Sequence, residues 1–216
     1  MRKEENSEKL LYSDSLLQVQ LLSAADMTSL LAKSNRRLGA YLRKEKLHLV
    51  TAESLTAGSL SGYIADISGA SDYLSGAFVC YTNQAKQTLL GIPASMLEKY
   101  SAVSAPVVQS MARNSLKRLP QADIAVALSG YAGPQTANWQ EKEACGTVYF
   151  ALALPLQLID QSIKQVTCAA TDCIACAYGD DVAVFTYKKI FSPKRNLVRL
   201  AACLFAIREL SAILAI

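Results

Sequence analysis

Hydrophobic and polar residues alternate along this chain in two patterns, one typical of β-strands and the other of α-helices. Short apolar runs rich in β-branched residues indicate buried strands, whereas apolar residues spaced three and four positions apart indicate helices that bury one face. The runs predict strands that begin near 47, 77, 123 and 146, with further strands at 157–168 and 181–191. The helical spacing predicts helices at 28–46, 59–67, 93–100, 104–119 and 194–214, and a short helix that ends at Gly91.

Strands that alternate with helices indicate a layered α/β domain, in which helices pack against a central sheet. The pattern from 28 to 216 contains neither a linker nor an internal repeat, so we expect a single domain there. Residues 1–27 carry mixed charge and an irregular apolar pattern, and we interpret them as an N-terminal extension without an assigned role.

The composition is that of a globular protein with a large buried core. Of the 216 residues, 51% are hydrophobic and 19% are charged, which excludes intrinsic disorder. The net charge is only +4 and the basic residues are scattered, so nothing favours a nucleic-acid-binding protein.

We expect the protein in the cytoplasm and not in a membrane. The most apolar segment, 197–216, is interrupted by Arg199, Arg208 and Glu209, which a membrane-spanning helix rarely carries. The amino-terminal residues mix both charges and lack the apolar centre of a signal peptide. The six cysteines are therefore expected as reduced thiols.

Ser54 lies where the chain changes abruptly from a strand pattern to a helical pattern. The first N–H groups of a helix have no partner within the helix, and they point towards whatever occupies such a turn. A hydroxyl nucleophile or an anion site often occupies this position. Ser54 is therefore a candidate nucleophile, and Thr56 and Gly58 follow directly after it.

The single histidine, His48, is too far from Ser54 to act as its general base. Six residues of strand separate two positions by about 20 Å, which argues against a Ser-His-Asp arrangement within one subunit. A lysine with a lowered pKa, or a tyrosine coupled to one, can accept the proton instead. Tyr81 and Lys86 follow the second strand, and strand-end residues gather at one crevice in open α/β sheets. The alternative interpretation of Lys86 is a solvated helix residue.

Two other groups of residues carry weaker signals. The segment 129–134 also follows a strand, and its glycines permit close approach of N–H groups to an anion, although ordinary turn chemistry explains them equally well. Cys168, Cys173 and Cys176 have spacing typical of a metal site but no clear fourth ligand. We expect unligated thiols there, and neither a metal nor another cofactor.

These segments together resemble the C-terminal domain family of the competence/damage-inducible protein CinA, whose active members are nicotinamide-nucleotide amidases. The resemblance extends from about 28 to 214, and it is interrupted near 156–179 by a cysteine-bearing segment that resembles an insertion. The matching motifs are Thr51-Ala52-Glu53-Ser54-x-Thr56-x-Gly58, Tyr81-Thr82-Asn83-x-Ala85-Lys86, Leu90-Gly91-Ile92-Pro93, Ala102-Val103-Ser104, Ser129-Gly130-x-Ala132-Gly133-Pro134, Gly146-Thr147-Val148, and Phe191 with Arg195 and Arg199.

The resemblance implies a single three-layer α/β/α domain with a central, mostly parallel or mixed sheet, in a protein that forms homo-oligomers. It implies a metal-independent amidohydrolase that converts nicotinamide mononucleotide to nicotinate mononucleotide and ammonia. By this resemblance Ser54 is the nucleophile, Lys86 is its base, Tyr81 relays or orients the proton, and Arg195 meets the substrate phosphate. The implied substrate-binding residues are Thr56, Gly58, Asn83, Ser129, Gly130, Gly133 and Arg195.

The chain departs from the family pattern close to the expected site. Ala57 replaces a glycine three residues after Ser54, and its β-carbon restricts the backbone. A glycine-rich loop of the family is replaced by 135–141, which contains the bulky Trp139 and no glycine. Two hypotheses therefore stay open, an amidohydrolase and a catalytically inactive relative that keeps the pocket for a nucleotide or a partner. A metal-dependent module built on the cysteines is a third alternative.

Overall fold

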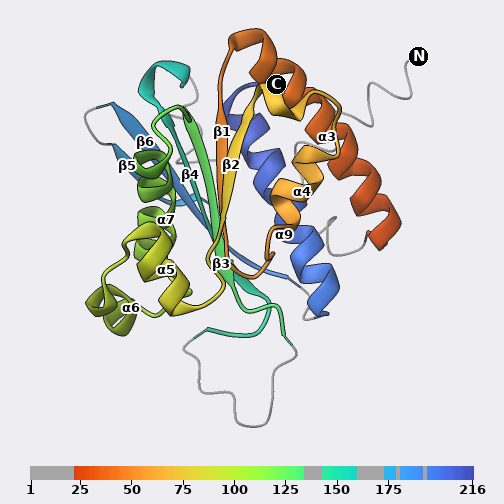
Figure 1. Cartoon of the computed structure of the whole chain (residues 1–216). Helices are drawn as coiled ribbons and strands as arrows, with labels where there is room; N and C mark the ends of the chain where they lie inside the picture. Colours follow the sequence, from red (N-terminus) through yellow and green to blue (C-terminus); the bar gives the residue numbers. More distant parts are fainter. Residues whose placement is uncertain (1–21, 134–142, 160–172, 179–180, 192–193) are drawn as a thin grey trace.

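The protein forms a six-stranded mixed sheet with the strand order β2-β1-β3-β4-β6-β5 (Figure 1). The computed structural model describes residues 22–133, 143–159, 173–178, 181–191 and 194–216. In chain order the strands are β1 (Leu49–Glu53), β2 (Leu74–Val79), β3 (Ile124–Gly130), β4 (Thr147–Pro155), β5 (Cys173–Tyr178) and β6 (Val182–Ile190). The helices are α3 (Ala24–Glu45), α4 (Ser59–Ala65), α5 (Asn83–Leu90), α6 (Ala94–Tyr100), α7 (Ala105–Arg118) and α9 (Arg195–Ile213).

The sheet has a parallel half and an antiparallel half. β1 pairs in parallel with both β2 and β3, whereas β4, β6 and β5 continue the sheet in antiparallel pairs. The prediction of a mostly parallel or mixed sheet is therefore confirmed in its mixed form. Because β1, β2 and β3 run in the same direction, their carboxyl ends meet at one edge of the sheet, where ligands usually bind.

Helices cover both faces of the sheet, which confirms the three-layer α/β/α architecture. α3, α4 and α9 lie on one face, and α5, α6 and α7 lie on the other (Figure 1). Strand β4 contributes to both cores: Val148, Phe150 and Leu152 pack in the core that includes α9, whereas Tyr149 and the small residues Ala151 and Ala153 pack in the core that includes α7. The small residues let α7 approach the sheet closely, and the alternation follows from the two-residue period of a strand.

The first helix begins earlier than the sequence pattern predicts. α3 begins at Ala24, because the Ser23 side chain accepts a hydrogen bond from the Asp26 backbone N–H at 3.1 Å and the Asp26 carboxylate accepts one from the Ser23 N–H at 3.3 Å. Such a reciprocal cap fixes the beginning of a helix. The proposed boundary after residue 27 stays a prediction, since residues 1–21 lie outside the described part of the chain.

The strand predicted at 157–168 is wrong for 157–159, the part of that range that the structure describes. Leu156–Leu158 form a short 3-10 turn after β4, residues 160–172 lie outside the described ranges, and the edge strand is β5. The short helix predicted to end at Gly91 is confirmed as α5, with Gly91 in the left-handed conformation at its end. Of the helices within the described ranges, none is both long enough and apolar enough to cross a bilayer.

Candidate active site

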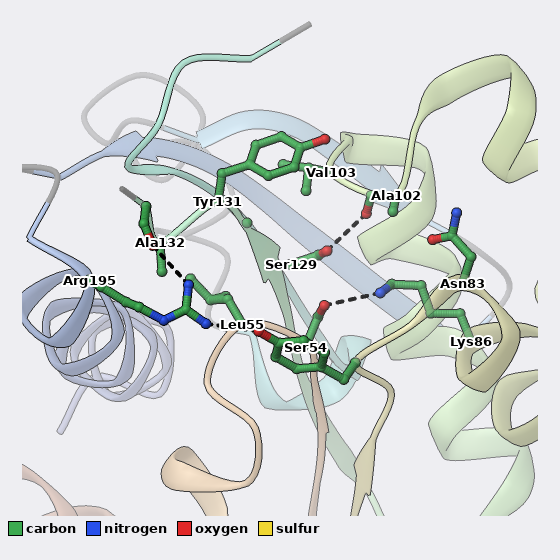
Figure 2. Close-up of a pocket in the computed structure, with 13 residues that line it drawn as sticks. Ser54, Leu55, Asn83, Lys86, Ala102, Val103, Ser129, Tyr131, Ala132 and Arg195 are labelled. Atoms are coloured by element: carbon green, nitrogen blue, oxygen red, sulfur yellow. Dashed lines mark hydrogen bonds between the residues drawn. The ribbon is translucent and has the colours of Figure 1, made fainter. Parts of the chain in front are cut away.

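A pocket of about 300 Å3 opens at the carboxyl ends of the parallel strands (Figure 2). Eight of the ten residues predicted for the site line it, whereas Thr56 and Gly58 do not. The structure therefore brings the predicted set together, while the role of each residue stays a prediction. The lining residues are Ser54, Leu55, Tyr81, Asn83, Lys86, Ala102, Val103, Ser129, Gly130, Tyr131, Ala132, Gly133 and Arg195.

Ser54 and Lys86 form a buried pair at the bottom of this pocket. Ser54 directly follows β1 and is 7% exposed, and Lys86 lies in the first turn of α5 and is 1% exposed. The Lys86 Nζ donates hydrogen bonds to the Ser54 Oγ at 3.0 Å and to the Cys80 carbonyl oxygen at 2.9 Å. Thr82 caps α5 by accepting from the Ala85 N–H at 3.1 Å, and this directs the first turn of α5 towards Ser54. The alternative interpretation of Lys86 as a solvated residue is wrong.

Burial lowers the pKa of Lys86 to about 8, and the neighbouring Cys80 partly opposes this effect. A buried ammonium group without a carboxylate beside it loses its hydration and gains no ion pair in return. The neutral amine is therefore accessible near physiological pH, which a general base requires. His48, in contrast, precedes β1 at the opposite end of the strand from Ser54.

Tyr81 and Arg195 form the outer part of the pocket. The Arg195 guanidinium donates to the Tyr81 hydroxyl oxygen at 2.9 Å and to the Gly133 carbonyl oxygen at 2.9 Å. Tyr81 is 52% exposed, so this cation is held at the mouth and not in the core. Because Lys86 contacts Ser54 directly, the geometry requires no proton relay through Tyr81. Tyr81 contacts Arg195, and its role in relaying or orienting the proton stays a prediction.

Strand β3 forms a further wall of the pocket. The Ser129 hydroxyl donates to the Ala102 carbonyl oxygen at 2.9 Å, and Figure 2 shows this bond beside the pocket. Gly130 has no room for a side chain, because a β-carbon there would lie 2.5 Å from the Thr147 carbonyl oxygen. Asn83, at the beginning of α5, lies on the rim close to Lys86.

The turn after Ser54 is closed by Glu53, a residue that the sequence analysis did not assign to any role. The buried Glu53 carboxylate accepts hydrogen bonds from the Thr56 hydroxyl at 2.7 Å and from the Leu60 and Ser61 N–H groups at 3.0 and 2.8 Å. An internal carboxylate therefore occupies these two N–H groups at the beginning of α4, and anion binding by the N–H groups of the turn itself stays a prediction. The sequence did contain a signal for this role of Glu53, a carboxylate at the end of a predicted buried strand and shortly before a predicted helix. A buried carboxylate needs hydrogen-bond donors, and the N–H groups at the beginning of a helix can supply them.

Arg199 of α9 supports the same turn from the other side. Its Nη2 donates to the Thr56 carbonyl oxygen at 2.8 Å and to the Ser59 hydroxyl at 2.8 Å. Thr56 thus contributes both its hydroxyl and its carbonyl group to holding the turn. It supports Ser54 and does not face the pocket.

Ala57 adopts the left-handed conformation, with φ of 50°, at the position where the family pattern has glycine. This conformation costs an L-residue about 1–2 kcal/mol, whereas a glycine loses about 0.5–1 kcal/mol more backbone entropy on folding. Ala57→Gly is therefore expected to raise the free energy of unfolding by up to about 1 kcal/mol, measured by urea denaturation. The matched control is Ala65→Gly at an exposed helical position of α4, which is expected to lower it by a similar amount. Equal destabilisation by both changes would contradict strain at Ala57.

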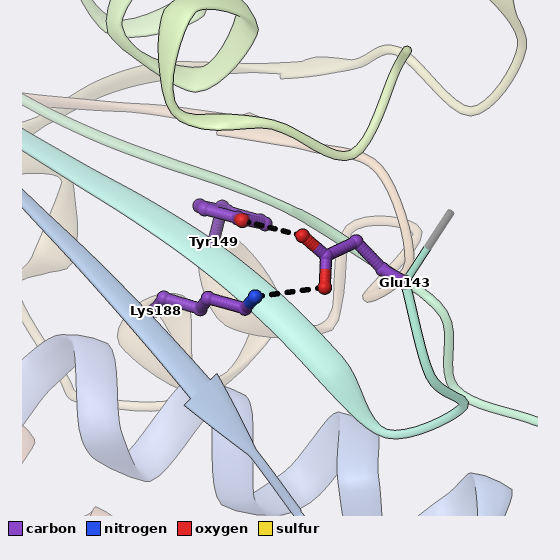
Figure 3. A network of polar contacts seen from close by, with 3 residues as sticks. All are labelled: Glu143, Tyr149 and Lys188. Atoms are coloured by element: carbon purple, nitrogen blue, oxygen red, sulfur yellow. Dashed lines mark hydrogen bonds and ion pairs between the residues drawn. The ribbon is translucent and has the colours of Figure 1, made fainter. Parts of the chain in front are cut away.

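A second polar cluster lies away from the pocket, on the antiparallel half of the sheet (Figure 3). The Tyr149 hydroxyl donates to Glu143 at 2.7 Å, and the Lys188 Nζ lies 2.8 Å from the other carboxylate oxygen. Burial alone would raise the pKa of Glu143, but the hydrogen bonds from Lys188 and Tyr149 outweigh it and hold that pKa below its usual value. None of the three residues lines the pocket. They join β4 and β6 to the segment that leads into β4.

No group of three or more His, Cys, Asp and Glu residues within the described ranges is arranged to bind a metal ion. Cys168, one member of the predicted cysteine group, lies outside those ranges. The described pocket itself contains no thiol, imidazole or carboxylate among its lining residues.

The model of the CinA C-terminal domain matches residues 31–169 of this chain. The chain belongs to the CinA C-terminal domain family. A relative from Enterobacter agglomerans, named nicotinamide-nucleotide amidohydrolase PncC, is 36% identical over 171 residues, which cover 79% of this chain and 87% of that protein. A putative competence-damage inducible protein from Symbiobacterium thermophilum is 44% identical over 116 residues, which cover 54% of this chain. The match spans only 26% of that longer CinA relative.

Solved structures of CinA proteins share the fold. The competence or damage-inducible protein from Enterobacter asburiae superposes with a TM-score of 0.68 at 28% identity, covering 85% of this chain and 98% of that one. The competence damage-inducible protein A from Klebsiella pneumoniae gives a TM-score of 0.69 at 26% identity, covering 86% and 97%. The resemblance seen in the motifs is therefore confirmed for both the family and the fold.

Proposed function

We propose that this protein is an amidohydrolase that cleaves the carboxamide of a pyridine mononucleotide, with nicotinamide mononucleotide as the preferred substrate. The observation that carries the proposal is the buried hydrogen bond between Lys86 and Ser54, a base and a nucleophile at 3.0 Å. The Enterobacter agglomerans relative named as a nicotinamide-nucleotide amidohydrolase supports the choice of bond and substrate.

The charges of the pocket favour an anionic substrate. Its lining contains two cations, Lys86 and Arg195, and no acidic residue. Arg195 lies at the exposed mouth, where a guanidinium fork suits a phosphate group, while the reacting carboxamide would reach Ser54 below it. The volume of about 300 Å3 lies at the lower end of the range of ligand pockets, so a mononucleotide suits it better than a dinucleotide.

The reaction divides into acylation and hydrolysis. Neutral Lys86 takes the proton of the Ser54 hydroxyl while the Ser54 Oγ attacks the carboxamide carbon, and the protonated Lys86 then gives that proton to the leaving nitrogen. Ammonia leaves and an ester between Ser54 and the nicotinoyl group remains. A water molecule, deprotonated by Lys86, cleaves the ester, and it releases the carboxylate and restores the serine.

The direct test is ammonia release from nicotinamide mononucleotide by the purified full chain, with Ser54→Ala as the control. Turnover that disappears in Ser54→Ala supports the proposal, and formation of the nicotinate nucleotide confirms the bond cleaved. Absence of turnover above the Ser54→Ala background, at high protein concentration, rejects the amidohydrolase for this substrate.

The second candidate function is a catalytically inactive relative that binds the nucleotide. It is favoured by Ala57, which adopts a left-handed conformation close to Ser54 at a position where the family pattern has glycine. Calorimetric titration with nicotinamide mononucleotide separates the two: binding without turnover supports the second function, and an Arg195→Ala variant should then lose that binding.

The rate of hydrolysis is expected to rise with pH through about 8. Only the neutral amine of Lys86 accepts the serine proton, and its fraction grows from about a tenth one pH unit below the pKa to about nine-tenths one unit above it. We expect kcat/KM to increase about tenfold per pH unit on the acidic side and to level off above the pKa of Lys86. A profile that is flat across this range would show that Lys86 is not the base.

A further inference from the structure

The edge strand β5 contains an irregularity that brings two cysteines together. Its sequence is Cys173-Ile174-Ala175-Cys176, and in a regular strand residues three apart point to opposite faces of the sheet. The register with β6 shifts between Cys173 and Ala175, so Ile174 is an extra residue without a partner in β6. Such a bulge reverses the alternation of the residues that follow it.

The bulge places both cysteines on the same face. Cys173 lies opposite Tyr187 and Cys176 lies opposite Phe185, and both aromatic residues belong to the core on the α9 face. The two sulfur atoms are 3.3 Å apart, and both side chains are half-buried at the edge of that core. Two thiols in contact, and within reach of solvent, are placed for oxidation to a disulfide.

The other described cysteines differ from this pair in burial. Cys80, Cys145 and Cys203 are buried. Burial raises the pKa of Cys80 to about 11 and raises the pKa of Cys203 still further, so neither thiol is a ready nucleophile. Within the described residues, only Cys173 and Cys176 combine partial exposure with a second sulfur in contact.

We propose that Cys173 and Cys176 form a reversible disulfide, which makes the edge strand β5 a redox-sensitive modification site. The oxidant is a small-molecule disulfide of the glutathione class. One cysteine thiolate attacks this disulfide, forms a mixed disulfide and releases a thiolate. The second cysteine thiolate then attacks the mixed disulfide, the bond between Cys173 and Cys176 forms, and a second thiolate leaves. The two protein thiols lose two protons and two electrons, and the small disulfide is reduced to two thiols.

The test uses the full chain in a Cys168→Ser background, because a single tryptic peptide, 165–188, contains all three cysteines. The protein is treated with oxidised glutathione, quenched with acid, alkylated and digested. We expect Cys173 and Cys176 to lose their reactivity towards the alkylating agent together, and the peptide to lose two hydrogen atoms without gaining glutathione. Dithiothreitol should restore both thiols. Peptides that carry only glutathione adducts or two alkylated cysteines would overturn the proposal.

A matched control separates geometry from nearness in sequence. Ala175 lies opposite Thr186, whose hydroxyl accepts a hydrogen bond from Gln109 of α7, so Ala175 is on the face opposite to Cys173. The double change Ala175→Cys and Cys176→Ser keeps two thiols in the strand but puts them on opposite faces. We expect glutathione adducts and no internal disulfide in this variant. An internal disulfide formed at the parent rate would show that the bulge is not responsible, and it would overturn the assignment.

Discussion

Replacing Lys86 by methionine is expected to lower the rate of carboxamide hydrolysis at least about a thousandfold, because Ser54 then has no base. Methionine fills a similar volume but accepts no proton. The measurement is kcat for nicotinamide mononucleotide, followed by ammonia release. Lys86→Arg is the matched variant, since it keeps the charge but its guanidinium does not deprotonate. We expect it to be as inactive as Lys86→Met, and a variant of either kind within about tenfold of the parent would contradict the assignment.

The loss of activity in Lys86→Met will not come from unfolding. The pKa of Lys86 falls from its ordinary value of 10.5 to about 8 in the folded chain, so the buried ammonium costs about 3 kcal/mol at neutral pH. This cost is fully present below the folded pKa and disappears as the pH rises to the ordinary value. Methionine carries no charge to desolvate. We therefore expect the variant to be at least as stable as the parent at neutral pH, as measured by urea denaturation.

Replacing Glu53 by alanine is expected to lower the free energy of unfolding by at least about 3 kcal/mol. The change removes the acceptor of two backbone N–H groups, those of Leu60 and Ser61, and of two hydroxyl groups, those of Thr51 and Thr56. Each buried donor left unpaired costs about 1–3 kcal/mol. The measurement is the denaturation midpoint in urea, together with the slope that tests two-state behaviour.

Two further changes calibrate that result. Glu53→Gln keeps the shape and one acceptor oxygen, so we expect it to lie between the parent and Glu53→Ala. Glu98→Ala, at an exposed position of α6, is expected to change stability by less than about 0.5 kcal/mol. If Glu53→Ala is no more destabilising than Glu98→Ala, the carboxylate does not hold the turn.

The local parts of this site were predictable from the sequence, because they depend on short segments. A strand followed at once by a helix places Ser54 at a turn, and the second strand followed by a short helix places Lys86 near the beginning of α5. That these two turns meet was an inference from the parallel arrangement of β1 and β2, which the pairing of the strands bears out. The family motifs added the substrate class, which no local pattern contains.

The unpredicted parts depend on contacts between distant segments or on irregular backbone. Glu53 was visible as a motif residue, but its partners are N–H groups whose positions follow from the fold. The edge strand was predicted at 157–168 because the apolar run after β4 resembles a strand. The bulge at Ile174 could not be predicted, because the spacing of apolar residues does not reveal an extra residue in a strand. The lowered pKa of Lys86 arises from burial by several elements, which a single sequence does not specify.

The last helix, α9, supplies both Arg195 at the pocket mouth and the cover of one face of the sheet, where it packs against α3 near the other end of the described chain. During synthesis the ribosome releases Ser54 and Lys86 long before α9. A nascent chain therefore exposes the large apolar side chains of α3, β4 and β6 until α9 emerges, and exposed apolar surface of this kind favours aggregation. The same delay leaves the mouth of the pocket without Arg195 until α9 emerges.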